Sequence, residues 1–247
     1  MSYAAPGVGT EFRVGNVMNR AFAICVANFP FFFIITLVFA LPNLLTVLNQ
    51  PVPGQPPDVG ARLPAFGLAI VLGLVLNTIG EAVILYGAFQ RLSGRPFQPA
   101  EAFQRALARF LPLLGLALLY GICLVLGFAL FLVPGLILLV MWAVVVPACV
   151  VEGLGPIESM SRSAALTKGH RWAILGIMLL AGIVNWIGSL IIGLVLGAAG
   201  AVAVGIVNLV WTAVWAVYWN CLLVMLYHDL RVAKEGIASE QIASVFD

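Results

Sequence analysis

Residues 110–151 read FLPLLGLALLYGICLVLGFALFLVPGLILLVMWAVVVPACVV and contain no charged side chain over 42 consecutive positions. A helix that crosses the ~30 Å hydrocarbon core of a bilayer needs about 20 mostly apolar residues, so this stretch is long enough for two such helices. As one helix it would measure about 63 Å, twice the thickness of that core. Because Pro134 and Gly135 lie near its middle, we expect two membrane-spanning helices joined there by a tight turn.

The rest of the chain has the same character. Other uncharged runs cover residues 21–57, 63–80 and 172–227. Over the 247 residues, 63% are apolar and 9% are charged, whereas an average soluble domain is about 45–50% apolar and about 25% charged. The sequence therefore predicts an all-α polytopic membrane protein that forms a single integral membrane domain over residues 1–247.

Three amphipathic segments precede pairs of apolar segments and predict helices that lie flat at the membrane interface. We expect these interfacial helices at about 12–28, 99–109 and 156–169. We expect membrane spans at about 29–48, 63–90, 110–132, 135–151, 172–196 and 201–227, followed by a tail at 228–247.

The basic residues indicate an orientation. In the six-span scheme eleven Lys and Arg residues fall on one side of the membrane, and Arg62 alone falls on the other. Cytoplasmic loops carry an excess of Lys and Arg. We therefore expect a multi-pass protein of the bacterial inner membrane with both termini in the cytoplasm.

A short motif occurs three times, at residues 16–21, 101–106 and 158–163. In each copy an Asn or Glu stands four residues before an Arg, and each copy precedes a pair of spans. The repeat predicts three equivalent units, each an interfacial helix followed by a hairpin, in a pseudo-threefold arrangement. Arg20, Arg105 and Arg162 would then contact lipid head groups. Alternatively, these are ordinary surface pairs of helices, aligned by chance.

Two longer motifs resemble a known family. They comprise Val133–Leu136, Trp142, Pro147–Ser159, Arg162-Ser163 and Leu166–Gly169, and then Tyr227–Arg231 with Glu235-Gly236. This pattern resembles the bacterial membrane-domain family named after glycerophosphoryl diester phosphodiesterases, whose members have six spans. The resemblance implies an accessory, lipid-associated or transport-like membrane domain. The soluble phosphodiesterase and its metal-binding residues are missing here, so no catalytic residue is implied.

The spans contain few polar residues that could form a site. Glu81 is the one charged residue within a predicted span, and a carboxylate at that depth is expensive unless it faces the protein interior. Asn77 lies one turn before it, and Asn185 and Thr212 fall at a similar depth in the last two spans. These four residues are candidates for a polar cavity, with Asn185 and then Thr212 as partners of Glu81. The alternative is that they form hydrogen bonds that hold the helices together.

The sequence contains no pattern typical of catalysis, metal binding or nucleotide binding. Four dispersed cysteines and two interfacial histidines form no metal-binding or redox spacing, and no nucleotide-binding or hydrolase motif is present. We therefore expect no catalytic residue, metal or cofactor, and no nucleic-acid partner.

Two functions remain. One is a non-enzymatic membrane protein that handles or permeates a lipid-related or small amphipathic molecule through a polar interior around Glu81, with membrane lipids as partners. The other is a membrane scaffold that binds further envelope proteins. A cavity that reaches Glu81 would favour the first function.

Overall fold

A computed structural model describes residues 14–48 and 59–235, in which every regular element is helical. Six segments are long and apolar enough to cross a membrane, so the prediction of an all-α polytopic membrane protein is confirmed. The helices are α1 (Val14–Phe39), α2 (Leu41–Leu48), α3 (Val59–Leu92), α4 (Pro99–Ala108), α5 (Phe110–Leu130), α6 (Leu132–Met141), α7 (Val145–Val151), α8 (Pro156–Thr167), α9 (Arg171–Leu196) and α10 (Ala201–Glu235), with a 3₁₀ turn at Gly197–Ala199.

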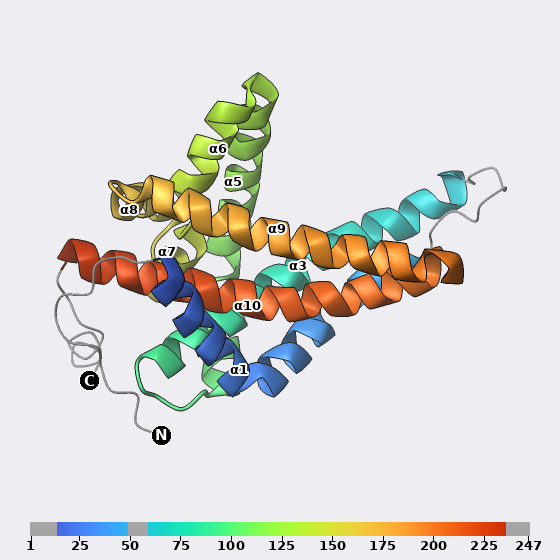
Figure 1. Cartoon of the computed structure of the whole chain (residues 1–247), viewed down its shortest axis with the longest axis horizontal. Coiled ribbons are helices and arrows are strands. Elements are labelled where there is room, and N and C mark those ends of the chain that lie inside the picture. The colour runs from blue at the N-terminus through green and yellow to red at the C-terminus, as the bar shows by residue number, and fades with distance from the viewer. Residues whose placement is uncertain (1–13, 49–58, 236–247) are drawn as a thin grey trace.

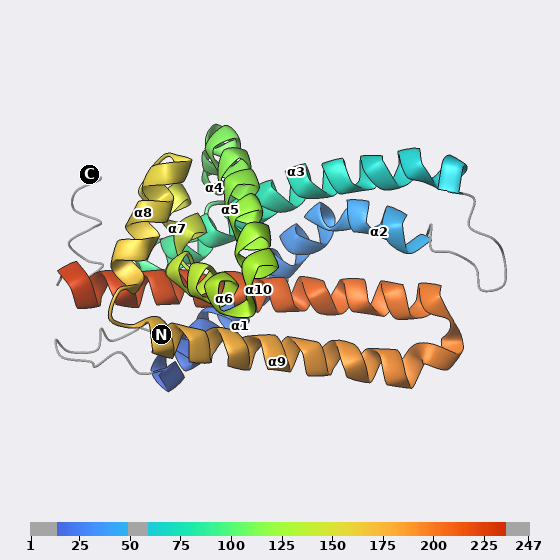
Figure 2. The same cartoon turned by 90° about the horizontal axis from the view of Figure 1, so that it is seen from above.

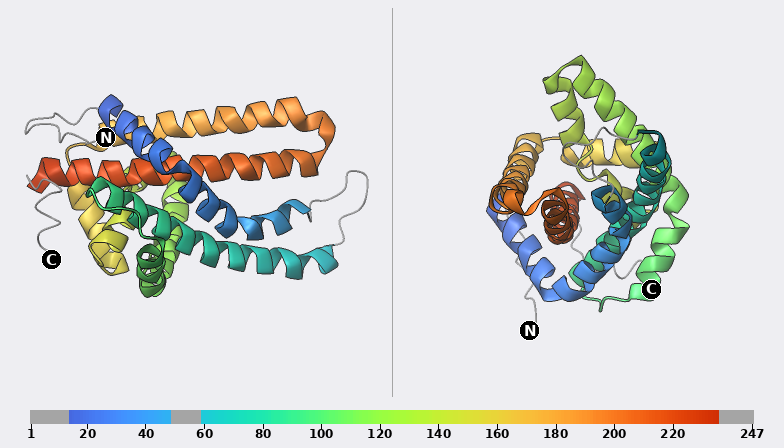
Figure 3. Two further views of the ribbon diagram at one scale, coloured as in Figure 1. Left: turned by 90° about the horizontal axis from the view of Figure 1, so that it is seen from below. Right: turned by 90° about the vertical axis from the view of Figure 1, so that its right-hand side faces the viewer.

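The helices are not all parallel. Helices α9 and α10 form a long antiparallel hairpin, and α3 runs beside them along the same axis (Figures 1 and 2). Helix α1 crosses α10 obliquely, and the α5–α6 hairpin stands across the long axis (Figure 3). The turn between α9 and α10 lies at one end of the molecule, and α8 lies at the other end with the last turns of α10.

The first unit differs from the expected repeat. Helix α1 continues through residues 28 and 29 without interruption, so it joins the predicted interfacial helix to the predicted span. The break comes instead at Ala40, between α1 and α2. Pro42 favours a break here, because a proline has no N–H group to bond to the carbonyl oxygen of residue 38. The second and third units do begin with separate helices, α4 and α8.

The fourth span is broken as well. It consists of α6 and α7, which are joined by a turn at residues 142–144. Pro147 lies in the first turns of α7 and lacks the N–H group that a continuous helix would bond to the carbonyl oxygen of residue 143. Side chains of α8 compensate: the hydroxyls of Ser163 and Thr167 donate to the carbonyl oxygen of Met141 over 3.0 and 3.1 Å, and the N–H of Val144 donates to Ser163 Oγ over 3.3 Å.

The hairpin turn between α5 and α6 lies at Phe131, three residues before the predicted turn. Pro134 falls in the first turn of α6, where a missing N–H costs no helical hydrogen bond. Gly127 and Gly135 let the two helices approach closely, since a Cβ on Gly127 would lie 3.2 Å from the Cα of Gly135.

The buried core lies where α1, α3, α7 and α10 meet, toward the α8 end of the molecule. Residues 220–227 of α10 are all buried, as are Cys149 and Val150 of α7. By contrast, the long arm of α9 has only Ile174, Ile177 and Ala181 buried. A large exposed apolar surface of this kind needs lipid around it, which fits a membrane protein.

Candidate functional site

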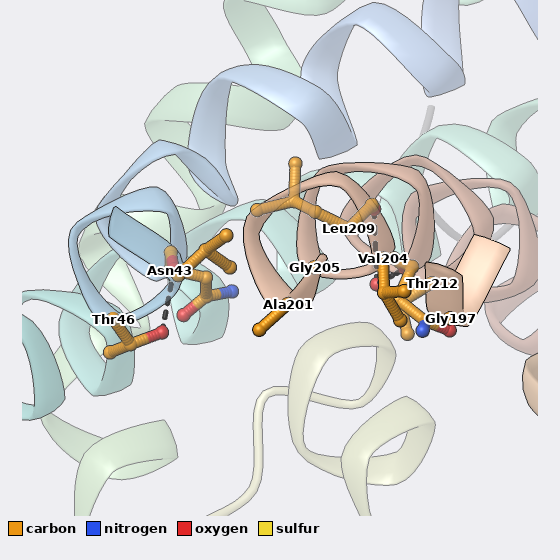
Figure 4. A pocket seen from close by; sticks show the side chains of 10 residues that line it. Asn43, Thr46, Gly197, Ala201, Val204, Gly205, Leu209 and Thr212 are labelled. Atoms are coloured by element: carbon orange, nitrogen blue, oxygen red, sulfur yellow. Dashed lines mark hydrogen bonds between the residues drawn. The ribbon is translucent and has the colours of Figure 1, made fainter. Parts of the chain in front are cut away.

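A groove of about 600 Å³ lies between α2 and α10, toward the end that carries the α9–α10 turn. Figure 4 shows Asn43 and Thr46 on α2 opposite Ala201 and Gly205 on α10. Every lining residue is uncharged, and the set is Asn43, Thr46, Val47, Gly197, Ala201, Val204, Gly205, Asn208, Leu209 and Thr212.

The sequence explains why a groove forms here. The lining residues of α10 recur every three or four positions, so they occupy one face of that helix. Ala201 and Gly205 have almost no side chain, and the missing bulk leaves space opposite α2. Asn208 lies eight residues after Gly200, which corresponds to a depth of about 12 Å from the turn.

The polar groups of the groove divide into two kinds. The hydroxyls of Thr46 and Thr212 donate to carbonyl oxygens of their own helices, at Asn43 over 2.6 Å and at Asn208 over 2.8 Å. The side-chain amides of Asn43 and Asn208 make no hydrogen bond with any other residue that the structure describes. An amide has two donors and an acceptor, so these two side chains can bind a polar group in the groove.

The four residues predicted for a polar cavity do not come together. Thr212 lines the groove. Asn77 lies near Asn43: if Gly73 carried a Cβ, that atom would be 3.7 Å from Asn77 Nδ2 and 3.3 Å from Asn43 Oδ1. Asn185 instead accepts a hydrogen bond of 3.1 Å from Trp211 Nε1, which joins α9 to α10. The prediction that Asn185 or Thr212 is the partner of Glu81 is wrong.

Glu81 does not line the groove. Its side chain is half-buried on α3 and makes no ion pair or hydrogen bond with the described residues. Tyr120 of α5 lies within electrostatic range of its carboxylate. Similar depth did not make these residues partners, because Asn185 faces Trp211 of α10 and Thr212 faces the groove toward α2.

At the opposite end, charged side chains join α7, α8 and α10. Arg162 Nε donates to both oxygens of Glu152 over 2.9 Å, and its Nη2 donates to Glu235. Tyr227 also donates to Glu152 over 2.6 Å, and Arg231 donates to Glu235 over 2.9 Å. We call these five residues the ion-pair cluster.

The ion-pair cluster keeps Arg162 charged. Burial by itself lowers the pKa of the Arg162 guanidinium, but the hydrogen bonds and negative charges of Glu235 and Glu152 raise this pKa overall. The cluster lies off the long apolar spans and fastens helices to one another. Its chemistry is that of a structural clamp, because each carboxylate has a partner within the protein.

The three repeated arginines have different surroundings. Arg20 pairs with Asp229 of α10 over 3.0 Å, and Arg162 belongs to the ion-pair cluster. Arg105 lies over the ring of Tyr86, 5.7 Å from its centroid, while Glu101 binds Tyr86 and Gln90. Arg20 and Arg162 therefore form ion pairs within the protein, and the contact of the three arginines with lipid head groups stays a prediction.

Asn43 and Thr46 were missed because they lie near a proline-rich loop and were assigned to the end of a span. Their one available signal was spacing: they stand three residues apart, which places both on one face of a helix. Their position opposite α10 could not be read from local sequence.

The fold and the groove define a polytopic α-helical membrane protein with an uncharged polar groove. Residues 99–230, from the start of α4 to Leu230 in α10, match the family described as Domain of unknown function (DUF7847). The match covers more than half of the chain, and the protein belongs to this family. No curated protein and no solved structure matches the chain.

Proposed function

We propose that this protein binds a lipid-related or small amphipathic molecule with an uncharged polar group in the groove between α2 and α10. The observation that carries the proposal is the pair of amides, Asn43 and Asn208, which face the groove without a hydrogen-bond partner among the described residues. In an apolar surrounding an unsatisfied amide costs about 1–3 kcal/mol, and a bound polar group recovers that cost.

The lining favours an uncharged polar group. Among the described residues that line the groove there is no Lys, Arg, Asp or Glu, so a phosphate or an ammonium group would find no opposite charge in this lining. Amides and hydroxyls match ester carbonyls, hydroxyls and amides. The apolar chains of such a molecule can lie against exposed residues that flank the groove, such as Leu48 on α2 and Val202 on α10.

The groove volume is consistent with this class of ligand, since small-molecule sites commonly measure about 300–1,000 Å³. The similarity of the two longer motifs to the glycerophosphoryl diester phosphodiesterase membrane-domain family also favours a lipid-associated, non-enzymatic role. Glu81 lies outside the groove, so we place the ligand away from Glu81, on the α2–α10 side.

Native mass spectrometry of the protein, extracted in a mild detergent with its membrane lipids, tests the proposal. We expect the wild-type protein to retain an uncharged amphiphile. The double variant Asn43→Leu/Asn208→Leu should lose it, with affinity reduced roughly fivefold for each hydrogen bond removed. Thr78→Val is the matched control, because Thr78 lies outside the groove, half-buried on α3, and its hydroxyl bonds to Leu74 of its own helix.

Two outcomes would contradict the proposal. One is equal retention of the amphiphile by the double variant and the control. The other is a wild-type protein that carries no such molecule while the double variant unfolds at a higher temperature. The second outcome would make the groove a packing defect and would favour the scaffold function, in which envelope proteins rather than lipids are the partners.

A further inference from the structure

Three cationic side chains gather where the α8–α9 turn meets the end of α10. Lys168 and Arg171 flank the turn, and Lys234 Nζ lies 3.9 Å from the position that a Cβ on Gly169 would occupy. Gly169 has φ +92°, a value that favours glycine and lets the chain reverse between α8 and α9. The reversal places positions 168 and 171 on either side of the turn at Gly169, which Lys234 Nζ approaches.

These cations are not neutralised by the part of the chain that the structure describes. The ion pairs found there engage Arg20, Arg162, His228 and Arg231 but none of these three side chains. Arg171 Nε is in addition buried without a hydrogen-bond partner in residues 14–48 and 59–235. The nearest carboxylate along the chain, that of Glu235, is bound to Arg162 and Arg231. The three positive charges therefore lie in one region, and one of them, Arg171, also has a donor (Nε) that lacks an acceptor among the described residues.

An apolar surface begins at the same point. Trp172, the residue after Arg171, is 87% exposed, and tryptophan prefers the level of the lipid head groups. From there exposed apolar side chains continue along α9, including Leu179, Ile183 and Ile187. Helix α9 has 26 residues, which is about 39 Å, enough to accompany an acyl chain across a leaflet.

We propose that Lys168, Arg171 and Lys234 form a binding site for the phosphate of an acidic phospholipid, whose acyl chains lie along the exposed face of α9. The charges match an anionic head group, and the adjoining apolar face distinguishes a phospholipid from a soluble phosphate. This site is independent of the groove: it lies at the other end of the molecule and selects negative charge, whereas the groove is uncharged.

The test uses the full chain in lipid nanodiscs, with native mass spectrometry to count bound phosphatidylglycerol against phosphatidylcholine. The site variant is Arg171→Gln/Lys234→Gln. The control is Arg91→Gln/Arg95→Gln, which removes equal charge from exposed positions that have no ion pair among the described residues. We expect the site variant to bind phosphatidylglycerol more weakly, by roughly fivefold for each cation removed, and the control to retain wild-type affinity.

Two further measurements and one comparison of the variants decide the assignment. The exchange Arg171→Lys/Lys234→Arg keeps both charges and should keep the lipid, which separates loss of charge from loss of folding. Inorganic phosphate at millimolar concentration should not displace the lipid; if it does, the site is one for free phosphate. Equal weakening by the site variant and the control would show diffuse attraction between charges and overturn the proposal.

Discussion

The guanidinium of Arg162 joins three helices, because its two carboxylate partners come from the end of α7 and the end of α10. Its side chain is 26% exposed, so its removal should cost less than the ~3–5 kcal/mol measured for fully buried ion pairs. We expect Arg162→Gln to lower the free energy of unfolding by about 2 kcal/mol, measured by thermal unfolding in detergent. Arg91→Gln, which breaks no ion pair in the described residues, should change it by less than about 0.5 kcal/mol; similar losses for both variants would contradict a clamp at Arg162.

Gly188 permits a close contact between α9 and α10. A Cβ at this position would lie 2.1 Å from Cζ2 of Trp211, whose indole N–H is bonded to Asn185. We expect Gly188→Ala to destabilise the protein by about 1–3 kcal/mol, because the ring must move out of its packed position. Gly193→Ala is the matched control on the same helix, since a Cβ on Gly193 meets nothing within 4 Å. A Gly193→Ala variant as unstable as Gly188→Ala would show that helix flexibility, and not the indole contact, decides the result.

For individual residues, the sequence predicted which side chains are unusual but not which residues they contact. The arginines at positions 20, 105 and 162 stand out in the sequence by their spacing. Their partners do not, because Asp229 is 209 residues from Arg20 and Glu235 is 73 residues from Arg162. The expected pairs four residues apart give way to other bonds: Glu101 accepts from Tyr86 and Gln90, which are 15 and 11 residues away, and Glu158 accepts from the N–H of Gly155, three residues before it.

At the scale of the element, the break between α6 and α7 depends on α8. Ser163 and Thr167 satisfy backbone groups that the break leaves without helical partners, and both side chains are fully buried. We expect Ser163→Ala to lower stability by about 1–3 kcal/mol, since a buried carbonyl and a buried N–H each lose a partner. Thermal unfolding measures the effect, with Ser161→Ala on the exposed side of α8 as control. A neutral Ser163→Ala would mean that α6 and α7 hold their junction without α8.

The lengths of the elements were largely readable from sequence, and their interruptions were not. Uncharged runs predict helices close to α3, α5 and α9, because burial in lipid requires continuous apolar surface. The predicted boundary after residue 28 was wrong because a change in polarity does not end a helix; the break comes at Ala40, two residues before Pro42. Helix α10 likewise continues to Glu235, since Arg231 and Glu235 stand one turn apart and form an ion pair that favours helix.

For the whole molecule, the orientation in the membrane is open to a direct test. The α8 end carries Lys168, Arg171 and Lys234, and the α9–α10 turn lies at the opposite end without charge. In a chain whose four native cysteines are replaced, we expect Ser161→Cys to react only with a reagent that enters the cytoplasm. Ala199→Cys should react with an impermeant reagent added outside the cell. Labelling of both positions from the same side would contradict the six-span arrangement.

The arrangement of the whole could not be read from the sequence, because it depends on how the hairpins cross. Counting residues from the membrane surface assumes that all spans share one direction. The α5–α6 hairpin stands across α9 and α10 (Figure 1), so equal counts in different helices do not mean adjacency. Neighbouring helices that share an axis still meet through one face each: Thr212 lies on the face of α10 that lines the groove with α2, so the groove contains Asn43 in place of the predicted Asn185.

The dependence of the α6–α7 junction on α8 also has a consequence for biosynthesis. A ribosome delivers the chain from the N-terminus, so residues 142–144 enter the translocation machinery before Ser163 and Thr167 have been made. During that interval the carbonyl of Met141 and the N–H of Val144 must be solvated by water or shielded by an insertase. When α8 packs against the α6–α7 junction, its hydroxyls satisfy these two groups. The amphipathic helix of the third unit therefore completes the folding of the second unit.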